Sequence, residues 1–104
     1  MCIPFQLVHI DVHWTGAILW DPEKLKANIE KHGVRFRDAV PVLEDPRAIT
    51  IGDRESDFEE RFIMVGLDAL ARVLVVVYAW SGSDIRLISA RLANPHERQE
   101  YETQ

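Results

Sequence analysis

The sequence contains a single cysteine, Cys2, among 104 residues. One cysteine cannot form an intramolecular disulfide or a zinc site of four thiolates, and such scarcity suits the reducing cytosol. Residues 1–20 are fairly apolar, but His9, Asp11 and His13 interrupt them and no Lys or Arg precedes them. The segment therefore lacks the features of a signal peptide or a membrane span. We expect a cytoplasmic chain with no membrane partner.

Several catalytic and cofactor motifs are also missing. The sequence has no Gly-rich phosphate loop, no Cys/His zinc pattern and no G-x-S-x-G motif. Nucleotide hydrolysis and serine-esterase chemistry therefore lack support, and we expect no cofactor. With 47% hydrophobic and 28% charged residues, the composition is that of one globular domain.

The net charge is acidic, which at first argues against a nucleic-acid partner. The chain has 12 Lys and Arg against 17 Asp and Glu, a formal charge of -5. Residues 44–60 carry seven acidic and two basic residues, so this segment accounts for the whole net charge. Nine of the 12 basic residues are Arg, whose planar fork suits phosphate. A basic patch can therefore form elsewhere, although a mixed, solvated surface is the plain alternative.

The clearest helix lies near the N-terminus. Asp21 and Pro22 predict its start, because Asp accepts free N–H groups of the first turn and Pro needs no donor there. Gly33 predicts its end after His32. Helical spacing places Leu25, Ile29 and His32 toward the core, with Lys24, Asn28 and Lys31 in a stripe beside them.

The remaining pattern predicts an α+β fold. Residues 5–20 are a strand or irregular, and a helix over 36–44 should be short or distorted by Pro41. A short edge strand is expected at 48–51, and a capping box of Asn94 and Glu97 starts a final helix over 95–103. Stronger strands are expected at 61–66, 73–80 and 85–92. The expected architecture is a small, largely antiparallel sheet with two N-terminal helices and a C-terminal helix.

Several of these segments together resemble one protein family. They are Trp20-Asp21-Pro22-Glu23-Lys24, Asn28, Lys31-His32-Gly33-Val34, Phe36, Ala39, Ile85-Arg86-Leu87-Ile88-Ser89-Ala90-Arg91, Glu97 and Tyr101. In this order they resemble the BrnT toxins of type II toxin–antitoxin systems, over about residues 18 to 102. The resemblance implies a RelE-like ribonuclease fold in a toxin domain over 18–104. Residues 1–17 are then an N-terminal extension that family members generally lack.

The resemblance also implies an activity and partners. BrnT-type toxins are metal-independent ribonucleases that cleave RNA and halt translation. They are neutralised by a BrnA antitoxin with a ribbon-helix-helix DNA-binding part, and the complex represses its own operon. By this resemblance the chain contacts operator DNA only through the antitoxin and forms a homodimer or a 2:2 complex. The rival interpretation is a catalytically silent module that binds the antitoxin and supports operon repression.

Metal-free RNA cleavage uses the neighbouring 2′-hydroxyl as nucleophile, and it needs a base, an acid and cations. His32 is a candidate acid or base, because its unperturbed pKa lies near neutrality. It can equally be a buried histidine that holds the end of its helix. Lys31, Lys24 and Asn28 can steer phosphate from the same helix, or they can form a solvated face.

Arginines in the predicted strands are further candidates. Arg61 and Arg91 each lie among apolar or small residues, so each charge should face an open surface or be paired. We expect both to converge on the sheet face that carries Ser89 and to bind RNA phosphate. The alternative is an ion pair with Glu60 or Glu97. Arg86 is expected on the opposite face, where it can anchor RNA or the preceding turn.

Two further features are ambiguous. Tyr101 follows Glu97 by four residues and can contact an RNA base or the leaving group, or simply pack the last helix onto the sheet. In the segment His9-x-Asp11-x-His13, alternate residues share one face of a strand and resemble a metal site. Because three such residues often coincide by chance, we expect no metal site there.

Overall fold

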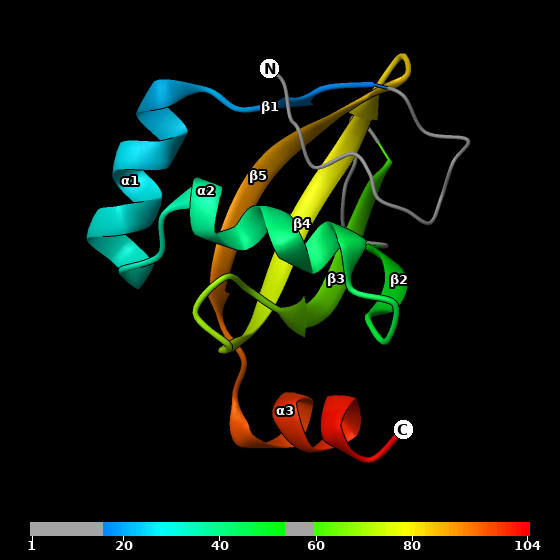
Figure 1. Cartoon of the computed structure of the whole chain (residues 1–104). Coiled ribbons are helices and arrows are strands. Elements are labelled where there is room, and N and C mark those ends of the chain that lie inside the picture. Colours follow the sequence, from blue (N-terminus) through cyan, green and yellow to red (C-terminus); the bar gives the residue numbers. More distant parts are fainter. Residues whose placement is uncertain (1–15, 54–59) are drawn as a thin grey trace.

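The protein folds as a five-stranded sheet with helices against one face and a final helix at one end (Figure 1). The structure is a computed structural model, and it describes residues 16–53 and 60–104. The sheet order is β1-β5-β4-β3-β2. The elements are β1 (Ile18–Leu19), α1 (Pro22–His32), α2 (Phe36–Ala39), the 3₁₀-helix η1 (Val40–Glu44), β2 (Ile49–Asp53), β3 (Arg61–Leu67), β4 (Val73–Ser81), β5 (Asp84–Leu92) and α3 (Pro95–Glu102). The α+β fold class is confirmed.

The sheet is mixed, so the antiparallel expectation was wrong at one edge. Strands β2 to β5 pair antiparallel, but β1 runs parallel to β5, with Ile18 opposite Ile85. The incoming chain is fixed at the β4–β5 turn, where the Ala17 N–H donates to Asp84 Oδ1 at 2.8 Å. A Cβ at Gly16 would lie 1.9 Å from the carbonyl oxygen of Ser83. Only glycine allows the backbone to pass this close.

The first two helical segments follow local sequence signals. Asp21 accepts a hydrogen bond from the Glu23 N–H at 2.8 Å, and Gly33 closes α1 with φ of 71°. Both ends were predicted. The single helix expected over 36–44 is divided into α2 and η1, because Pro41 has no N–H for an α-helical bond. The predicted distortion is therefore confirmed.

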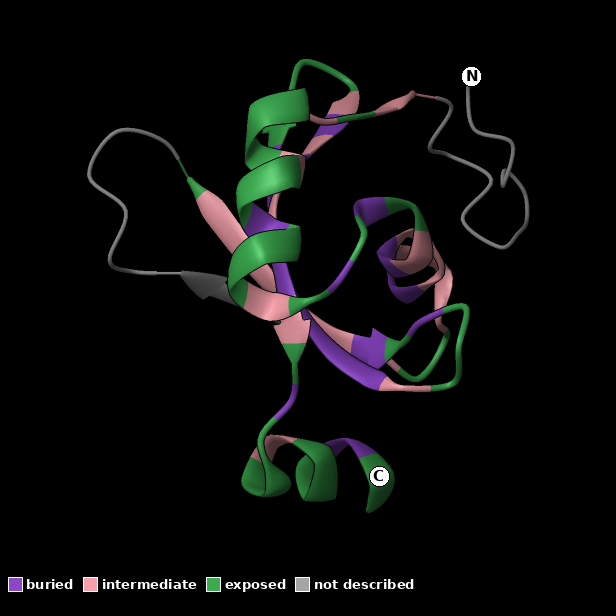
Figure 2. Ribbon diagram, turned by 90° about the vertical axis from the view of Figure 1, so that its left-hand side faces the viewer, coloured by how far each residue is buried: buried purple, intermediate pink, exposed green. Residues whose placement is uncertain are grey.

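The main core lies between the sheet and the segment that runs from α1 to η1 (Figure 2). Its largest fully buried side chains are Phe36, Leu74, Leu87, Val34, Val42 and Val76. Each large apolar side chain in such a position stabilises the fold by roughly 1.5–3 kcal/mol. Trp20 packs edge-to-face on Phe36 with ring centroids 5.9 Å apart. The sheet face toward these helices is thus closed by apolar packing.

The buried face of α1 differs from the predicted one. Ile29 was expected to face the core but is 39% exposed, whereas Asn28, expected in the outer stripe, is only 5% exposed. Leu25 and His32 remain partly buried as expected, so only the middle of the contact face differs, with Asn28 in the place of Ile29. The reason is a set of polar contacts that Asn28 makes with the sheet.

A β-bulge interrupts the pairing of β4 with β5. Val77 lies opposite Ser89, but the next residue, Tyr78, lies opposite Leu87, so Ile88 is an extra residue in β5. An inserted residue reverses the alternation of side chains beyond it. Simple alternation along β5 therefore assigns faces wrongly on one side of the bulge.

The bulge brings Arg86 and Arg91 to the same face of the sheet. Arg86 lies opposite Ala79 and Arg91 opposite Val75, and these two β4 residues share one face. The predicted placement of Arg86 on the opposite face was wrong for this reason. Arg61 of β3 also lies opposite Ala79. We call this side, which carries Arg61, Arg86, Ser89 and Arg91, the arginine face.

Helix α3 packs at one end of the arginine face. Its capping box of Asn94 and Glu97 is formed as predicted. The helix buries Tyr101 in a small second cluster with Val73, Val75 and Ala93. Within residues 16–53 and 60–104, no helix is both long and apolar enough to cross a membrane.

Candidate functional site

Arg61 and Arg86 flank the same residue, Ala79, on the arginine face. Two strand spacings separate their Cα atoms, a distance of roughly 9.5 Å. Two side chains as long as arginine can converge across that distance on one phosphate. In the described part of the chain, Arg61 Nε is the one buried side-chain nitrogen or oxygen without a hydrogen-bond partner. A donor buried without a partner costs roughly 1–3 kcal/mol.

Arg91 lies farther along the same face. Its β4 neighbour Val75 is four residues from Ala79, which is about 13 Å along a strand. The expected convergence of Arg61 and Arg91 is therefore not observed, and Arg86 takes the position nearest Arg61. Ser89 lies between the two levels, opposite Val77. The arginine face thus carries arginines at two positions along β4, beside Ala79 and beside Val75, with Ser89 between them.

Arg91 forms a bidentate ion pair with Glu97 of α3. Nη1 donates to Oε1 and Nη2 to Oε2, each at 2.9 Å, and Nη1 also donates to the Leu92 carbonyl oxygen at 3.2 Å. Hydrogen bonding between Arg91 and Glu97 is the main cause that raises the pKa of Arg91, and it is also the main cause that lowers the pKa of Glu97. The ion-pair alternative is confirmed for Arg91, although its side chain remains 40% exposed.

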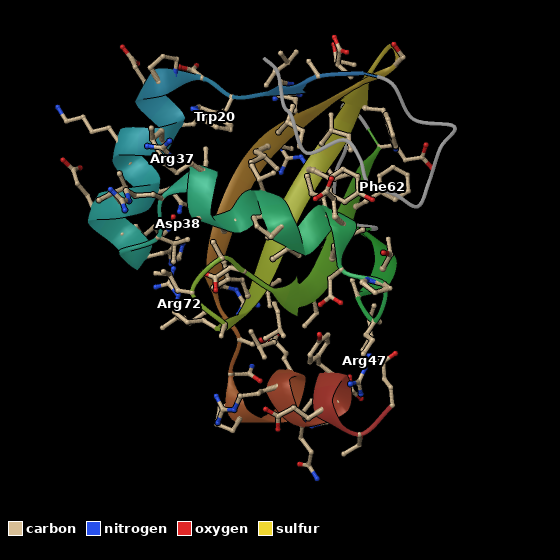
Figure 3. The ribbon with its side chains drawn as sticks, viewed as in Figure 1. Trp20, Arg37, Asp38, Arg47, Phe62 and Arg72 are labelled. Atoms are coloured by element: carbon tan, nitrogen blue, oxygen red, sulfur yellow. The ribbon has the colours of Figure 1, made fainter. Side chains whose placement is uncertain are left out.

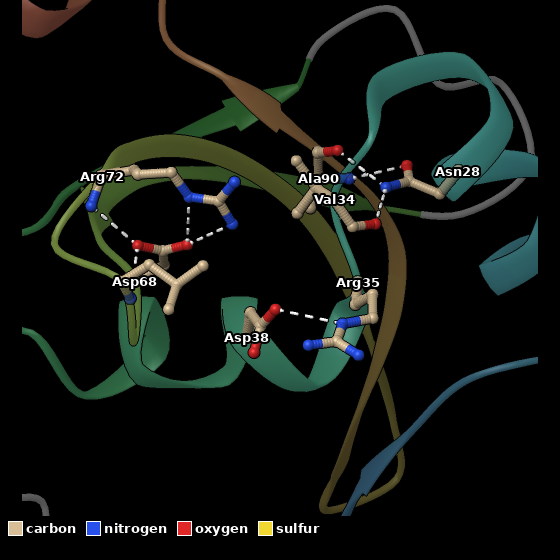
Figure 4. A network of polar contacts seen from close by, with 8 residues as sticks. Asn28, Val34, Arg35, Asp38, Asp68, Arg72 and Ala90 are labelled. Carbon is tan, nitrogen blue, oxygen red and sulfur yellow. Dashed lines mark hydrogen bonds and ion pairs between the residues drawn. The ribbon is translucent and has the colours of Figure 1, made fainter.

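Asn28 is fully occupied within the fold (Figure 4). Its Nδ2 donates to the carbonyl oxygens of Val34 and Ala90 at 2.9 and 2.8 Å, and its Oδ1 accepts from the Ala90 N–H at 3.0 Å. Both amide hydrogens are therefore used. The structure corrects the expected RNA contact of Asn28 to a structural role.

The charged candidates of α1 lie beside the sheet rather than on the arginine face. Lys24 and Lys31 are exposed, and His32 is partly buried one turn beyond Asn28. Arg91 bonds to Leu92 and Glu97 instead of to these three side chains. Figure 3 shows how side chains such as Arg37 and Asp38 extend from the segment that follows α1.

Tyr101 anchors α3 to the segment after η1. It is 5% exposed, and its hydroxyl donates to Asp45 Oδ2 at 2.5 Å. Burial and this bond raise the pKa of Tyr101 to about 12. Its proton is therefore held near neutral pH, and the packing alternative describes its placement. Asp45 also accepts the Leu67 and Arg47 N–H groups, each at 2.9 Å.

Sequence reasoning missed Asp45 and the adjacent Glu44. Both were counted in the acidic, solvated segment, and nothing in their sequence pattern separates them from it. Burial raises the pKa of Glu44 to about 7, so its carboxyl group titrates near neutrality. The Tyr101 hydroxyl and two backbone N–H groups lower the pKa of Asp45 against the effect of burial.

The candidate metal segment His9-x-Asp11-x-His13 lies outside the described residues. Within the described ranges, no group of three or more His, Cys, Asp or Glu side chains is arranged to hold a metal ion.

Comparison with known proteins places these features in a family. The sequence model of the family described as "Ribonuclease toxin, BrnT, of type II toxin-antitoxin system" matches residues 20–97. The 1.1 Å crystal structure of the Brucella abortus ribonuclease toxin BrnT is similar, with a TM-score of 0.61 and 28% identity. That match covers 77% of this chain and 99% of the Brucella chain. No curated protein sequence matches. The family match spans well over half of the chain, and the chain therefore belongs to the BrnT ribonuclease toxins of type II toxin–antitoxin systems.

Proposed function

We propose that the chain is a metal-independent endoribonuclease that cleaves RNA on its arginine face and thereby inhibits translation. The observation that carries the proposal is the pair Arg61 and Arg86 on either side of Ala79. Paired guanidinium groups are suited to a phosphate whose negative charge grows in the transition state. The family membership supports the reaction class, and the residue roles are our own proposal.

In the proposed reaction, the 2′-hydroxyl oxygen attacks the adjacent phosphorus and the bond to the 5′-oxygen breaks. The products are a 2′,3′-cyclic phosphate and a free 5′-hydroxyl. Arg61 and Arg86 stabilise the crowded phosphorane. Ser89 and Arg91 contact the RNA chain farther along the arginine face. His32, Lys24 and Lys31 lie on α1 beside the arginine face, so we assign them to positioning the RNA there. In the reaction, the proton of the 2′-hydroxyl passes through water to the leaving 5′-oxygen.

The resemblance to BrnT toxins supports the proposed partners and setting. The partner is a BrnA-like ribbon-helix-helix antitoxin, and the chain reaches operator DNA only through it. The proposed assembly is a homodimer or a 2:2 complex, the proposed location is the cytoplasm, and the proposed fold relationship is to RelE-like ribonucleases.

A cleavage assay tests the activity directly. Purified, antitoxin-free chain is incubated with RNA in EDTA, and the product ends are analysed. Cleavage that leaves 2′,3′-cyclic phosphate ends supports the proposal. Intact RNA, or cleavage that appears only after Mg²⁺ is added, contradicts metal-independent chemistry.

One observation favours the rival interpretation, a silent antitoxin-binding module. The Arg91 guanidinium is already paired with Glu97, as a purely structural arginine would be. Induced expression in cells separates the two interpretations. The ribonuclease arrests growth and Arg91→Ala relieves the arrest, whereas the module has no effect on growth in either form.

A further inference from the structure

The Arg91 guanidinium uses only one side of its planar group in the ion pair. Of its five N–H donors, three are occupied: Nη1 donates to Glu97 and to the Leu92 carbonyl oxygen, and Nη2 donates to Glu97. The Nε–H and the second Nη2–H have no partner among the described residues. These two donors lie on one edge of the group, and such an edge binds two oxygens of a phosphate.

That edge is accessible to a ligand. The Arg91 side chain is 40% exposed, and its unpartnered Nε is not among the buried unpaired atoms of the described residues. Arg91 also shares its sheet face with Arg61 and Arg86. An RNA strand that passes over the arginine face would therefore meet this edge about 13 Å along the strand direction from the other two arginines.

Glu97 is itself held rigidly. Its Oε1 accepts the Asn94 N–H at 2.9 Å, while the Glu97 N–H donates to Asn94 Oδ1 at 2.8 Å. The capping box thus fixes the carboxylate, and the carboxylate fixes the guanidinium. A side chain ordered before binding loses less conformational entropy when the ligand arrives.

We propose that Glu97 is a positioning residue of the RNA site, which grips one edge of Arg91 and presents the other edge to an RNA phosphate. The inference rests on the proposed RNA-cleaving function but assigns a role to a carboxylate that would otherwise repel RNA. A contact that merely blocks Arg91 would have the opposite effect on binding.

Binding of an uncleavable RNA tests this role apart from catalysis. A fluorescent 2′-O-methyl oligonucleotide is titrated with wild type, Glu97→Gln, Arg91→Ala and the double variant, and the folded fraction of each is checked by circular dichroism. Gln keeps the helix cap but provides only one oxygen acceptor. We expect Glu97→Gln to weaken binding about tenfold, the equivalent of about 1.4 kcal/mol. In the Arg91→Ala background the same change should have less than about a twofold effect.

Two matched variants sharpen the test. Glu100→Gln removes the same charge from the same helix at an exposed position, and it should tighten binding slightly or leave it unchanged. Arg91→Lys keeps the charge but lacks the second edge, so it should bind nearly as weakly as Arg91→Ala.

Three results would overturn the inference. Tighter binding by Glu97→Gln than by Glu100→Gln would mean that Glu97 blocks Arg91. If Glu97→Gln weakens RNA binding equally in the wild-type and Arg91→Ala backgrounds, Glu97 only stabilises α3. If the wild-type chain binds no RNA, the site is excluded. Failure of the proposed function is distinguishable, because a chain that binds RNA without cleaving it still shows the coupling.

Discussion

Asn28 and Ala90 pair across the outer edge of β5 as two strand residues would. The carboxamide accepts from the Ala90 N–H at 3.0 Å and donates to the Ala90 carbonyl oxygen at 2.8 Å. Strand β1 covers this edge only at Ile85 and Arg86. Beyond Arg86, the Asn28 side chain of α1 bonds to the edge of β5 in place of a neighbouring strand. The helix thus closes a part of the sheet edge that would otherwise be exposed. Ser89 and Arg91, the neighbours of Ala90, are thereby held in position on the arginine face.

Replacing this carboxamide should destabilise the fold strongly. Asn28→Asp puts a carboxylate oxygen where an NH₂ group now donates to two carbonyl oxygens. We expect a loss of about 3 kcal/mol or more in the free energy of unfolding, measured by urea denaturation. Ile29→Ala, at the exposed neighbouring position, should cost less than about 1 kcal/mol. Similar losses for the two variants would contradict the role of Asn28.

Removing the Tyr101 hydroxyl should loosen α3. Tyr101→Phe leaves the Asp45 carboxylate without its side-chain donor, and we expect a cost of about 1–2 kcal/mol in chemical denaturation. Tyr78→Phe is the matched control, because the Tyr78 hydroxyl has no hydrogen bond among the described residues. An ultraviolet titration should also show one tyrosine that ionises near pH 12 in wild type but not in Tyr101→Phe. Burial also raises the pKa of Tyr78, so the assignment is wrong if Tyr101→Phe leaves the step near pH 12 in place and removes the other tyrosine step instead.

Glu44 should make stability depend on pH. Burial raises its pKa to about 7 in the folded chain, against 4.5 for a solvent-exposed glutamate, so between these pH values the native state holds a proton that the unfolded state has lost. The part of the stability that is linked to Glu44 is therefore fully present below about pH 4.5, and it is lost as the pH rises through 7. At pH 8, Glu44→Gln should be more stable than wild type by on the order of 1 kcal/mol. Glu100→Gln serves as the exposed control, and an equal gain there would refute the role of Glu44.

Much of the fold could be predicted because its signals are local. The ends of α1 and the capping box of α3 depend on residues within a few positions of each other, and the apolar run of β4 marks a central strand. The distortion at Pro41 follows from a missing N–H group. Such signals require no knowledge of tertiary contacts.

The candidate site was harder to predict because it depends on pairing between distant segments. The extra residue Ile88 shifts Arg86 to the face of Arg91, and alternation in one strand cannot show a bulge that exists only relative to another. The burial of Asn28 depends on the open edge of β5, and the role of Asp45 on the approach of Tyr101. The alternative that Arg91 pairs with Glu97 was foreseen from the sequence, but not the free edge that the pairing leaves.

The most direct test of the account compares RNA cleavage by two arginine variants in EDTA. Arg61→Ala removes one of the two guanidinium groups beside Ala79, and Arg37→Ala removes the same charge from an exposed position on α2. We predict that Arg61→Ala lowers the single-turnover cleavage rate by about 100-fold or more, and that Arg37→Ala changes it by less than about threefold. Equal rates for the two variants at equal folded fraction would contradict cleavage on the arginine face.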